Sequence, residues 1–186
     1  MLVVGGGNSA AQILAEVSTV AETTWATLRA PRLLPDEVDG RVLFDVASRR
    51  QAALAAGRSD NGGVAALGDI VMVPSVRAAR DRGVLVARPM FTRLVADGVE
   101  WPDSTVGTFD SIIWCTGFRP DLGHLTPLGL STVDGVPMTV GTRSVDEPRL
   151  HLLGYGDWTG TASATIIGAA RTAKASVAEL VDHLAD

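Results

Sequence analysis

Residues 2–17 read LVVGGGNSAAQILAEV: an apolar run, a glycine-rich turn and an amphipathic pattern in direct succession. Gly5, Gly7 and Ala10 fill the G-x-G-x-x-G/A spacing of a dinucleotide-binding strand–turn–helix unit. The first glycine permits the tight turn, the second lets the backbone approach a pyrophosphate, and the small third residue lets helix and strand pack closely. The stretch therefore predicts an α/β sheet with a pyrophosphate held at the start of a helix. The alternative interpretation is a glycine-rich turn that only packs.

The composition is that of an ordinary globular protein. Of the 186 residues, 46% are hydrophobic and 20% are charged, which suits one domain or one and a half. The net charge of −5 argues against nucleic acid or an anionic membrane as the main partner. A single cysteine excludes an internal disulfide framework. No apolar run is long enough to span a bilayer and no basic leader precedes the fingerprint, so we expect a cytoplasmic protein.

The predicted second strand, residues 23–28, is followed by arginines where NAD-binding sequences carry an acid. That acid stands about 20 residues after the fingerprint and binds the ribose 2′-OH. Here Arg29 and Arg32 take its place, and a guanidinium suits a 2′-phosphate because it can donate two parallel hydrogen bonds. One such contact is worth about 1.5–3 kcal/mol, roughly a tenfold to hundredfold preference. We therefore expect NADP(H) rather than NAD(H); the alternative is that these arginines are solvated.

Between this strand and residue 111 the pattern predicts two helices and an inserted antiparallel flap. The helices cover 44–56 and 75–82, with a loop over 57–69 between them. The flap is predicted from β-prone runs, with a turn at Arg88–Pro89 and a hairpin signal at Asp97–Gly98. These runs are 84–87, 91–95 and 99–101.

The last third of the chain holds two further apolar runs and a long helical pattern. Residues 111–115, SIIWC, are expected to form a parallel strand buried on both faces. Residues 150–153 are expected to form another buried strand. A helix is predicted from about Ala162 to Leu184, because its apolar residues keep the spacing of a core-facing helix.

Three motifs stand in a particular order: GGGNSA at 5–10, DSIIWCTGF at 110–118 and LHLLGYGDWTG at 150–160. This order resembles the second half of two-dinucleotide-binding flavoproteins, in particular flavin-containing-monooxygenase-like and pyridine nucleotide-disulfide oxidoreductases. The resemblance covers nearly the whole chain. It implies a Rossmann-like parallel sheet with an inserted antiparallel β flap, and a C-terminal strand and helix of an incomplete FAD domain. The implied domains are an NADP-binding domain at 1–119 and the C-terminal portion of an FAD-binding domain at 120–186.

The resemblance also implies cofactor-binding positions. Residues of the glycine turn would bind the NADPH pyrophosphate, and the two arginines its 2′-phosphate. A crossing between the domains would follow the predicted strand at 111–115, and the third motif would contact the ribitol and ring of FAD. Asp157 has a second interpretation, as a helix-capping acid. The implied positions are Gly5, Gly7, Asn8, Ser9, Ala10, Arg29, Arg32, Thr116, Gly117, Gly156, Asp157, Trp158, Thr159 and Ala162.

The activity implied by the resemblance is hydride transfer from NADPH to FAD, as in monooxygenases. Because the cofactors carry out the bond-making, no catalytic residue is demanded and none is evident. His124, His151 and His183 are interpreted as structural, since they are scattered and show no metal-ligand spacing. Cys115 lies in an apolar run and is interpreted as a core residue.

The sequence departs from the family pattern because it holds a single glycine fingerprint. Family members begin with another fingerprint for the ADP half of FAD. The FAD-binding half is therefore either missing or supplied by a partner chain. We expect exposed apolar surface on 120–186, and with it a partner, aggregation or a non-native cap. The alternative is a non-catalytic NADP-binding module or truncated remnant that acts only with a partner. The substrate cannot be read from the sequence.

Overall fold

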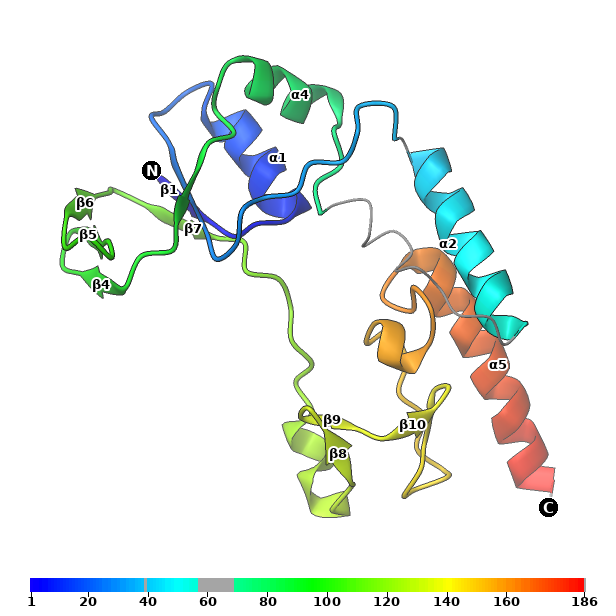
Figure 1. The fold of residues 1–186 in the computed structure, drawn as a ribbon. Coiled ribbons are helices and arrows are strands. Elements are labelled where there is room, and N and C mark those ends of the chain that lie inside the picture. Colours follow the sequence, from blue (N-terminus) through cyan, green and yellow to red (C-terminus); the bar gives the residue numbers. More distant parts are fainter. Residues whose placement is uncertain (39, 57–68, 186) are drawn as a thin grey trace. The chain divides into compact units, whose positions relative to one another are not determined.

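The computed structural model describes residues 1–38, 40–56 and 69–185 of the chain. They form two compact units, Met1–Phe118 and Arg119–Asp186. The division lies one residue from the boundary predicted from the sequence. Figure 1 follows the chain through both units. Among the described residues, no helix combines the length and the apolar character needed to cross a membrane.

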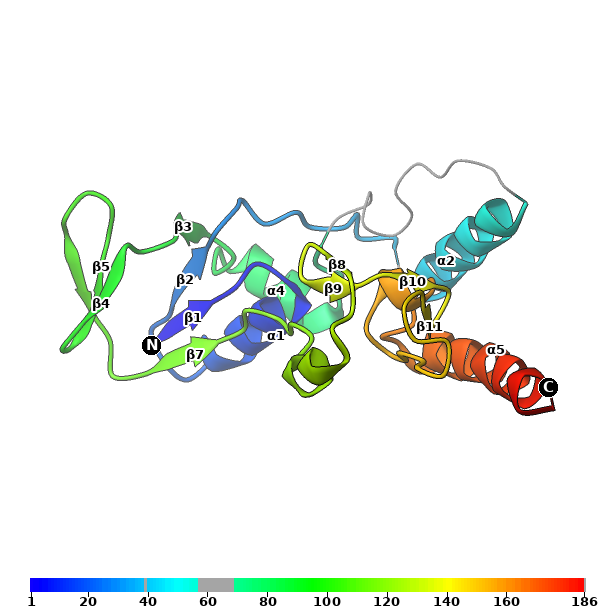
Figure 2. The same cartoon turned by 90° about the horizontal axis from the view of Figure 1, so that it is seen from below.

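A four-stranded parallel sheet forms the centre of the first unit, in the order β3-β2-β1-β7 (Figure 2). Strand β1 pairs in parallel with β2 on one side and with β7 on the other. The carboxyl ends of the strands therefore meet at one edge of the sheet, where the glycine turn follows β1. The strands are β1 (Leu2–Val4), β2 (Thr24–Thr27), β3 (Ala87–Pro89) and β7 (Ile112–Trp114).

Two helices of this unit share an apolar core with the sheet. Helix α1 (Asn8–Val17) and helix α4 (Pro74–Asp81) bury their small and aliphatic side chains together. These side chains form one cluster with Val3 of β1 and Trp25 of β2. A proline begins α4, where its missing N–H leaves no hydrogen bond unmade. A further helix, α2 (Gly40–Ala55), begins four residues before the predicted 44–56 and ends one residue earlier.

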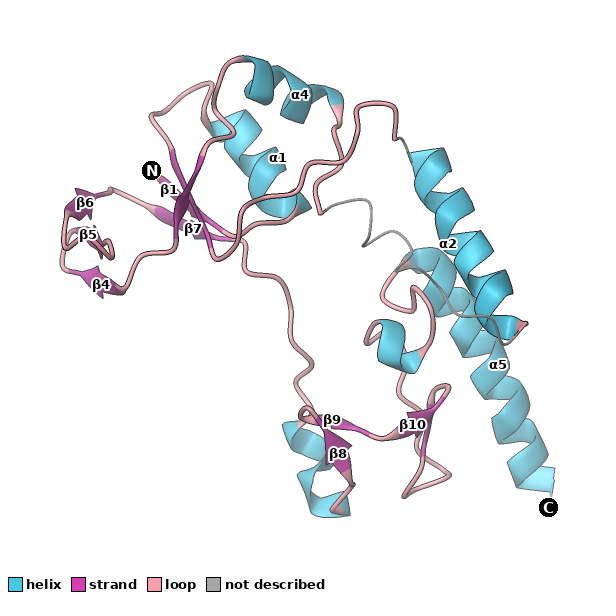
Figure 3. Ribbon diagram, viewed as in Figure 1, coloured by secondary structure: helices cyan, strands magenta, loops and turns pink. Residues whose placement is uncertain are grey.

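An antiparallel flap of three strands lies between β3 and β7 in the chain (Figure 3). Val99 and Trp101 from this part of the chain form a second core cluster with Leu2, Val4 and Ala26 of the parallel sheet. Because side chains alternate along a strand, Val3 packs with the helices while its neighbours pack with the flap. The flap strands are β4 (Arg93–Val95), β5 (Gly98–Glu100) and β6 (Val106–Thr108).

The second unit contains short elements and one long helix. Its four short strands form two separate antiparallel pairs, β8–β9 and β10–β11. The helices are two short 3-10 helices and α5 (Ile166–Ala185). The remaining elements are η1 (Gly123–Leu128), β8 (Thr132–Val133), β9 (Val136–Pro137), β10 (Thr139–Val140), β11 (Arg143–Ser144) and η2 (Asp157–Thr159).

The predicted flap differs from the observed one at both ends. The run at 84–87 leads into β3, which pairs with β2 in the parallel sheet, so the turn predicted at Arg88–Pro89 is wrong. Parallel pairing overrides the local turn signal there, and a proline is tolerated because β3 is an edge strand. The third flap strand, β6, was not predicted because it contains a single large apolar residue. The hairpin at Asp97–Gly98 is confirmed by the β4–β5 pairing.

Other predicted elements change in extent. The run 111–115 yields β7 at an edge of the sheet, and Trp114 is 53% exposed, so burial on both faces is wrong. The buried strand predicted at 150–153 is not formed, and this run contains one isolated β-bridge, between His151 and Arg143. The long helix begins at Ile166 rather than near Ala162, whose φ of 58° lies in the left-handed region. Gly57 and the predicted loop up to residue 68 lie outside the described residues.

The predicted core-facing stripe of the last helix is largely exposed. Ile166 is 93% exposed and Leu184 is 83% exposed. Ser176, by contrast, is buried on the same helix. Apolar spacing identifies the face that a partner could cover, and does not by itself supply the partner. Exposed apolar side chains on 120–186 are what the sequence led us to expect.

Candidate functional site

The glycine turn joins β1 to α1 at the carboxyl edge of the parallel sheet. Gly5 has a φ of 134°, a backbone conformation that residues other than glycine rarely adopt. A Cβ at this position would overlap the carbonyl group of Cys115. The fold itself therefore requires glycine at position 5, because β1 and the end of β7 approach closely there.

Gly7 stands in a different situation. It is the N-cap of α1, with φ −112° and ψ −171°, and no side chain caps the helix. A Cβ on Gly7 would find no atom of the described chain within 4 Å. Neither strain nor crowding explains a glycine here, whereas close approach of a ligand to the backbone would. The uncapped N–H groups of the first helical turn are of the kind that bind a phosphate.

Two polar contacts from distant parts of the chain hold the turn in place. The Trp25 indole N–H donates to the Gly5 carbonyl at 2.7 Å, and Trp25 is buried. The Val71 N–H donates to Oδ1 of Asn8 at 2.7 Å. Sequence reasoning missed both contacts, since the partners stand 20 and 63 residues apart and no local pattern joins them.

The remaining positions of the fingerprint differ in their exposure to solvent. Ala10 is fully buried between helix and sheet, as its position in the fingerprint predicts. Asn8 and Ser9 are exposed at the start of α1. The turn thus presents backbone and small polar groups outward and keeps its apolar member inside.

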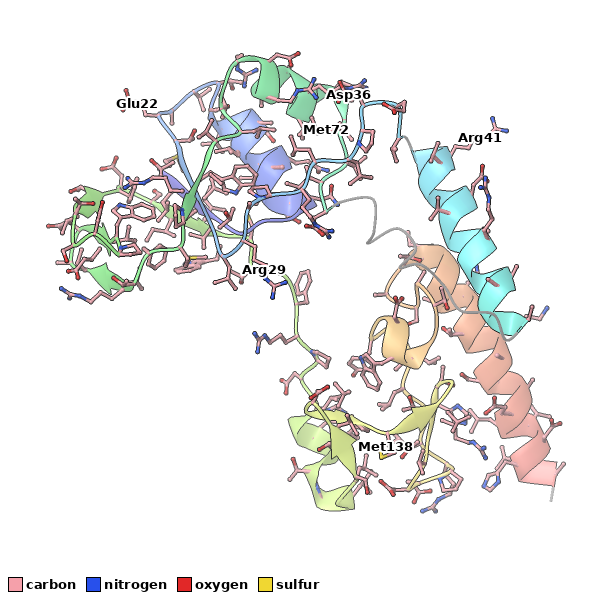
Figure 4. All side chains as sticks on the ribbon, viewed as in Figure 1. Glu22, Arg29, Asp36, Arg41, Met72 and Met138 are labelled. Atoms are coloured by element: carbon pink, nitrogen blue, oxygen red, sulfur yellow. The ribbon has the colours of Figure 1, made fainter. Side chains whose placement is uncertain are left out.

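The two predicted arginines follow β2 and have different partners. Arg29 is exposed at the end of β2 that lies opposite Glu22 (Figure 4). Its carbonyl oxygen lies 4.0 Å from the Cβ position of Gly6, so the backbone at Arg29 adjoins the turn. Arg32 donates from Nε and Nη2 to the two carboxylate oxygens of Asp69, at 2.9 and 2.7 Å. These hydrogen bonds hold the pKa of Asp69 below its ordinary value, with a smaller contribution from the charge of Arg29.

The segment after β7 is exposed and contains little ordered polar contact among the described residues. Thr116 and Gly117 are both exposed, and Gly117 has a φ of 78°. Burial raises the pKa of the neighbouring Cys115 thiol. A raised pKa disfavours the reactive thiolate, which agrees with the interpretation of Cys115 as a structural residue.

In the second unit, the loop from Gly156 to Ser163 is held by hydroxyl groups. Gly156 has a φ of 98° and precedes η2. Its carbonyl oxygen accepts hydrogen bonds from Ser163 at 2.6 Å and from Thr159 at 3.0 Å. Its N–H donates to Ser163 Oγ at 3.0 Å. Both hydroxyl side chains are fully buried, so the Thr159 side chain stabilises the loop from within.

The other predicted flavin positions of this loop, Asp157, Trp158 and Ala162, are exposed to different extents. Asp157 is exposed, and its Oδ1 accepts a hydrogen bond from the Ala162 N–H at 3.0 Å. This bond closes the loop and caps no helix, because Asp157 is the first residue of η2 and Ala162 lies before the start of α5. Trp158 is half-buried and packs against Tyr155 with ring centroids 5.7 Å apart. The roles of these residues toward FAD stay predictions.

Metal ligation finds no support in the part of the chain that the structure describes. No group of three or more histidine, cysteine, aspartate or glutamate side chains there could hold a metal ion. His151 instead uses Nδ1 in a 2.9 Å hydrogen bond with Thr142, which in turn contacts the buried Ser176 at 2.5 Å. The contact agrees with the structural interpretation of His151.

No protein-family model and no curated protein matches the chain. Solved structures do match it. A flavin-containing monooxygenase from Stenotrophomonas maltophilia is 48% identical over 98% of this chain and 49% of its own, with a TM-score of 0.78. A double mutant of the flavin monooxygenase from the same organism is 48% identical over 99% of this chain and 50% of its own, with a TM-score of 0.77.

A more distant structure has the same fold. Bacillithiol disulfide reductase from Staphylococcus aureus is 15% identical over 96% of this chain and 50% of its own, with a TM-score of 0.52. The chain thus spans about half the length of the relatives it matches. The resemblance inferred from the three sequence motifs is confirmed, and by this identity over nearly its whole length the chain belongs to the flavin-monooxygenase-like flavoproteins.

Proposed function

We propose that this chain supplies the NADPH-binding domain, and the ribitol side of the flavin site, of an NADPH-dependent flavoprotein oxidoreductase of the monooxygenase type. The observation that carries the proposal is Gly7, a glycine that the fold alone does not require, at the uncapped start of α1. The family relationship supports a flavin cofactor. When bound, nicotinamide and flavin supply the hydride chemistry.

The residues of the turn would bind the diphosphate through backbone groups. The N–H groups at the start of α1 lie at the positive end of the helix dipole, which favours the binding of an anion. Trp25 and Val71 hold Gly5 and Asn8 from two sides, so the turn is already ordered before a ligand arrives. A site that is ordered in advance loses less conformational entropy on binding. Arg29, exposed beside the turn, is the proposed donor to the 2′-phosphate.

The loop from Gly156 to Ser163 would face the flavin. A Cβ on Gly156 would find no described atom within 4 Å, so a ligand can approach the backbone there as at Gly7. The buried hydroxyls of Thr159 and Ser163 fix the loop shape. The exposed Asp157 carboxylate is suited to accept hydrogen bonds from ribitol hydroxyls.

We further propose that flavin binding takes place together with a second glycine fingerprint contributed by a partner. The family binds the ADP half of FAD with such a fingerprint, and the 186 residues contain one fingerprint only. Exposed apolar side chains in the second unit, among them Ile166 and Leu184, agree with a partner surface. The alternative, a non-catalytic NADP-binding module, differs from this proposal in binding NADPH without acquiring flavin.

The test is calorimetric titration of the purified chain with NADPH. The unaltered chain is expected to bind, and Gly7→Asp is expected to weaken binding at least about a hundredfold, since it places a carboxylate where the diphosphate would lie. Gln12→Glu is the matched control, because it adds the same charge five residues along the same helix at an exposed position. Unchanged NADPH affinity in Gly7→Asp would contradict the proposed site.

Visible absorbance tests the flavin part of the proposal. A yellow complex with FAD, formed with a partner that carries the second fingerprint and bleached by NADPH, is the expected result. A chain that binds NADPH and stays colourless under those conditions is the result expected of the non-catalytic module.

A further inference from the structure

We draw no further inference here: the strongest candidate, the exposed apolar face of α5 formed by Ile166, Val177, Val181 and Leu184, carries none because nothing in the structure shows what covers it.

Discussion

The two units of this chain are ordered by different forces. In the first unit, two clusters of buried apolar side chains lie on opposite faces of the parallel sheet. In the second unit, the buried groups include hydroxyl side chains that form hydrogen bonds with the backbone and with other hydroxyls. Ser163 bonds to Thr159, and Ser176 bonds to Thr142. Many apolar side chains there are exposed instead. The comparison teaches that the dinucleotide fingerprint rests on an apolar core, whereas the predicted flavin loop rests on local hydrogen bonds.

The largest expected effect is a difference in stability between two leucine-to-alanine variants, one in each unit. Leu14 of α1 is fully buried, whereas Leu184 of α5 is 83% exposed. Leu14→Ala is expected to lower the free energy of unfolding by about 3–5 kcal/mol, because it leaves a cavity in a packed core. Leu184→Ala is expected to change it by less than about 0.5 kcal/mol. Urea unfolding followed by circular dichroism measures both, and equal losses would contradict the difference between the units.

A smaller effect is expected where the core of the first unit supports the turn. Trp25→Phe removes the indole N–H that donates to the Gly5 carbonyl and leaves that oxygen without this donor. We expect a loss of about 1–3 kcal/mol in stability, together with weaker NADPH binding in calorimetry. Trp114→Phe is the control, since Trp114 is half-exposed on β7 of the same sheet. If the two variants bound NADPH equally well, Trp25 would have no part in positioning the turn.

The smallest expected effect is local to the second unit. Ser163→Ala removes both hydrogen bonds between the hydroxyl and Gly156, which are 2.6 and 3.0 Å long. A loss of about 1.4 kcal/mol, ordinary for a buried hydrogen bond, corresponds to roughly tenfold faster exchange of the Gly156 amide hydrogen. Nuclear magnetic resonance detects this exchange at a single amide. Ser75→Ala, at an exposed position of α4, is expected to leave it unchanged; an unaltered rate in Ser163→Ala would show that the loop is held by other contacts.

The parts of the fold that the sequence predicted are those encoded within a short stretch. The strand, turn and helix of 2–17 were predicted from residue spacing, because the residues that form each of these elements are close together in the sequence. Strand β3 was assigned to the flap, because its partner β2 lies about 60 residues earlier and parallel pairing leaves no local signal. Tertiary pairing thus decided an element that local propensity misassigned.

The same limit applies to the candidate site. The glycine positions and the two arginines were found from spacing along the chain. Trp25, Val71 and Asp69 were not, since each acts on a fingerprint or arginine residue at least 20 positions away. Only a structure brings such residues together. The order of three motifs did reveal the family, which the 48% identity to flavin monooxygenases over nearly the whole chain confirms.

The order of strands in the parallel sheet has a consequence for its two borders. On one side β3 ends at Pro89, a residue without a backbone N–H, which hinders pairing by a further strand. On the other side β7, with the sequence IIW, pairs with β1 alone among the described strands and contains neither proline nor charge. Lengthening of this sheet by a foreign segment is therefore directed to β7, and a lysine or proline introduced at Ile113 would close that route.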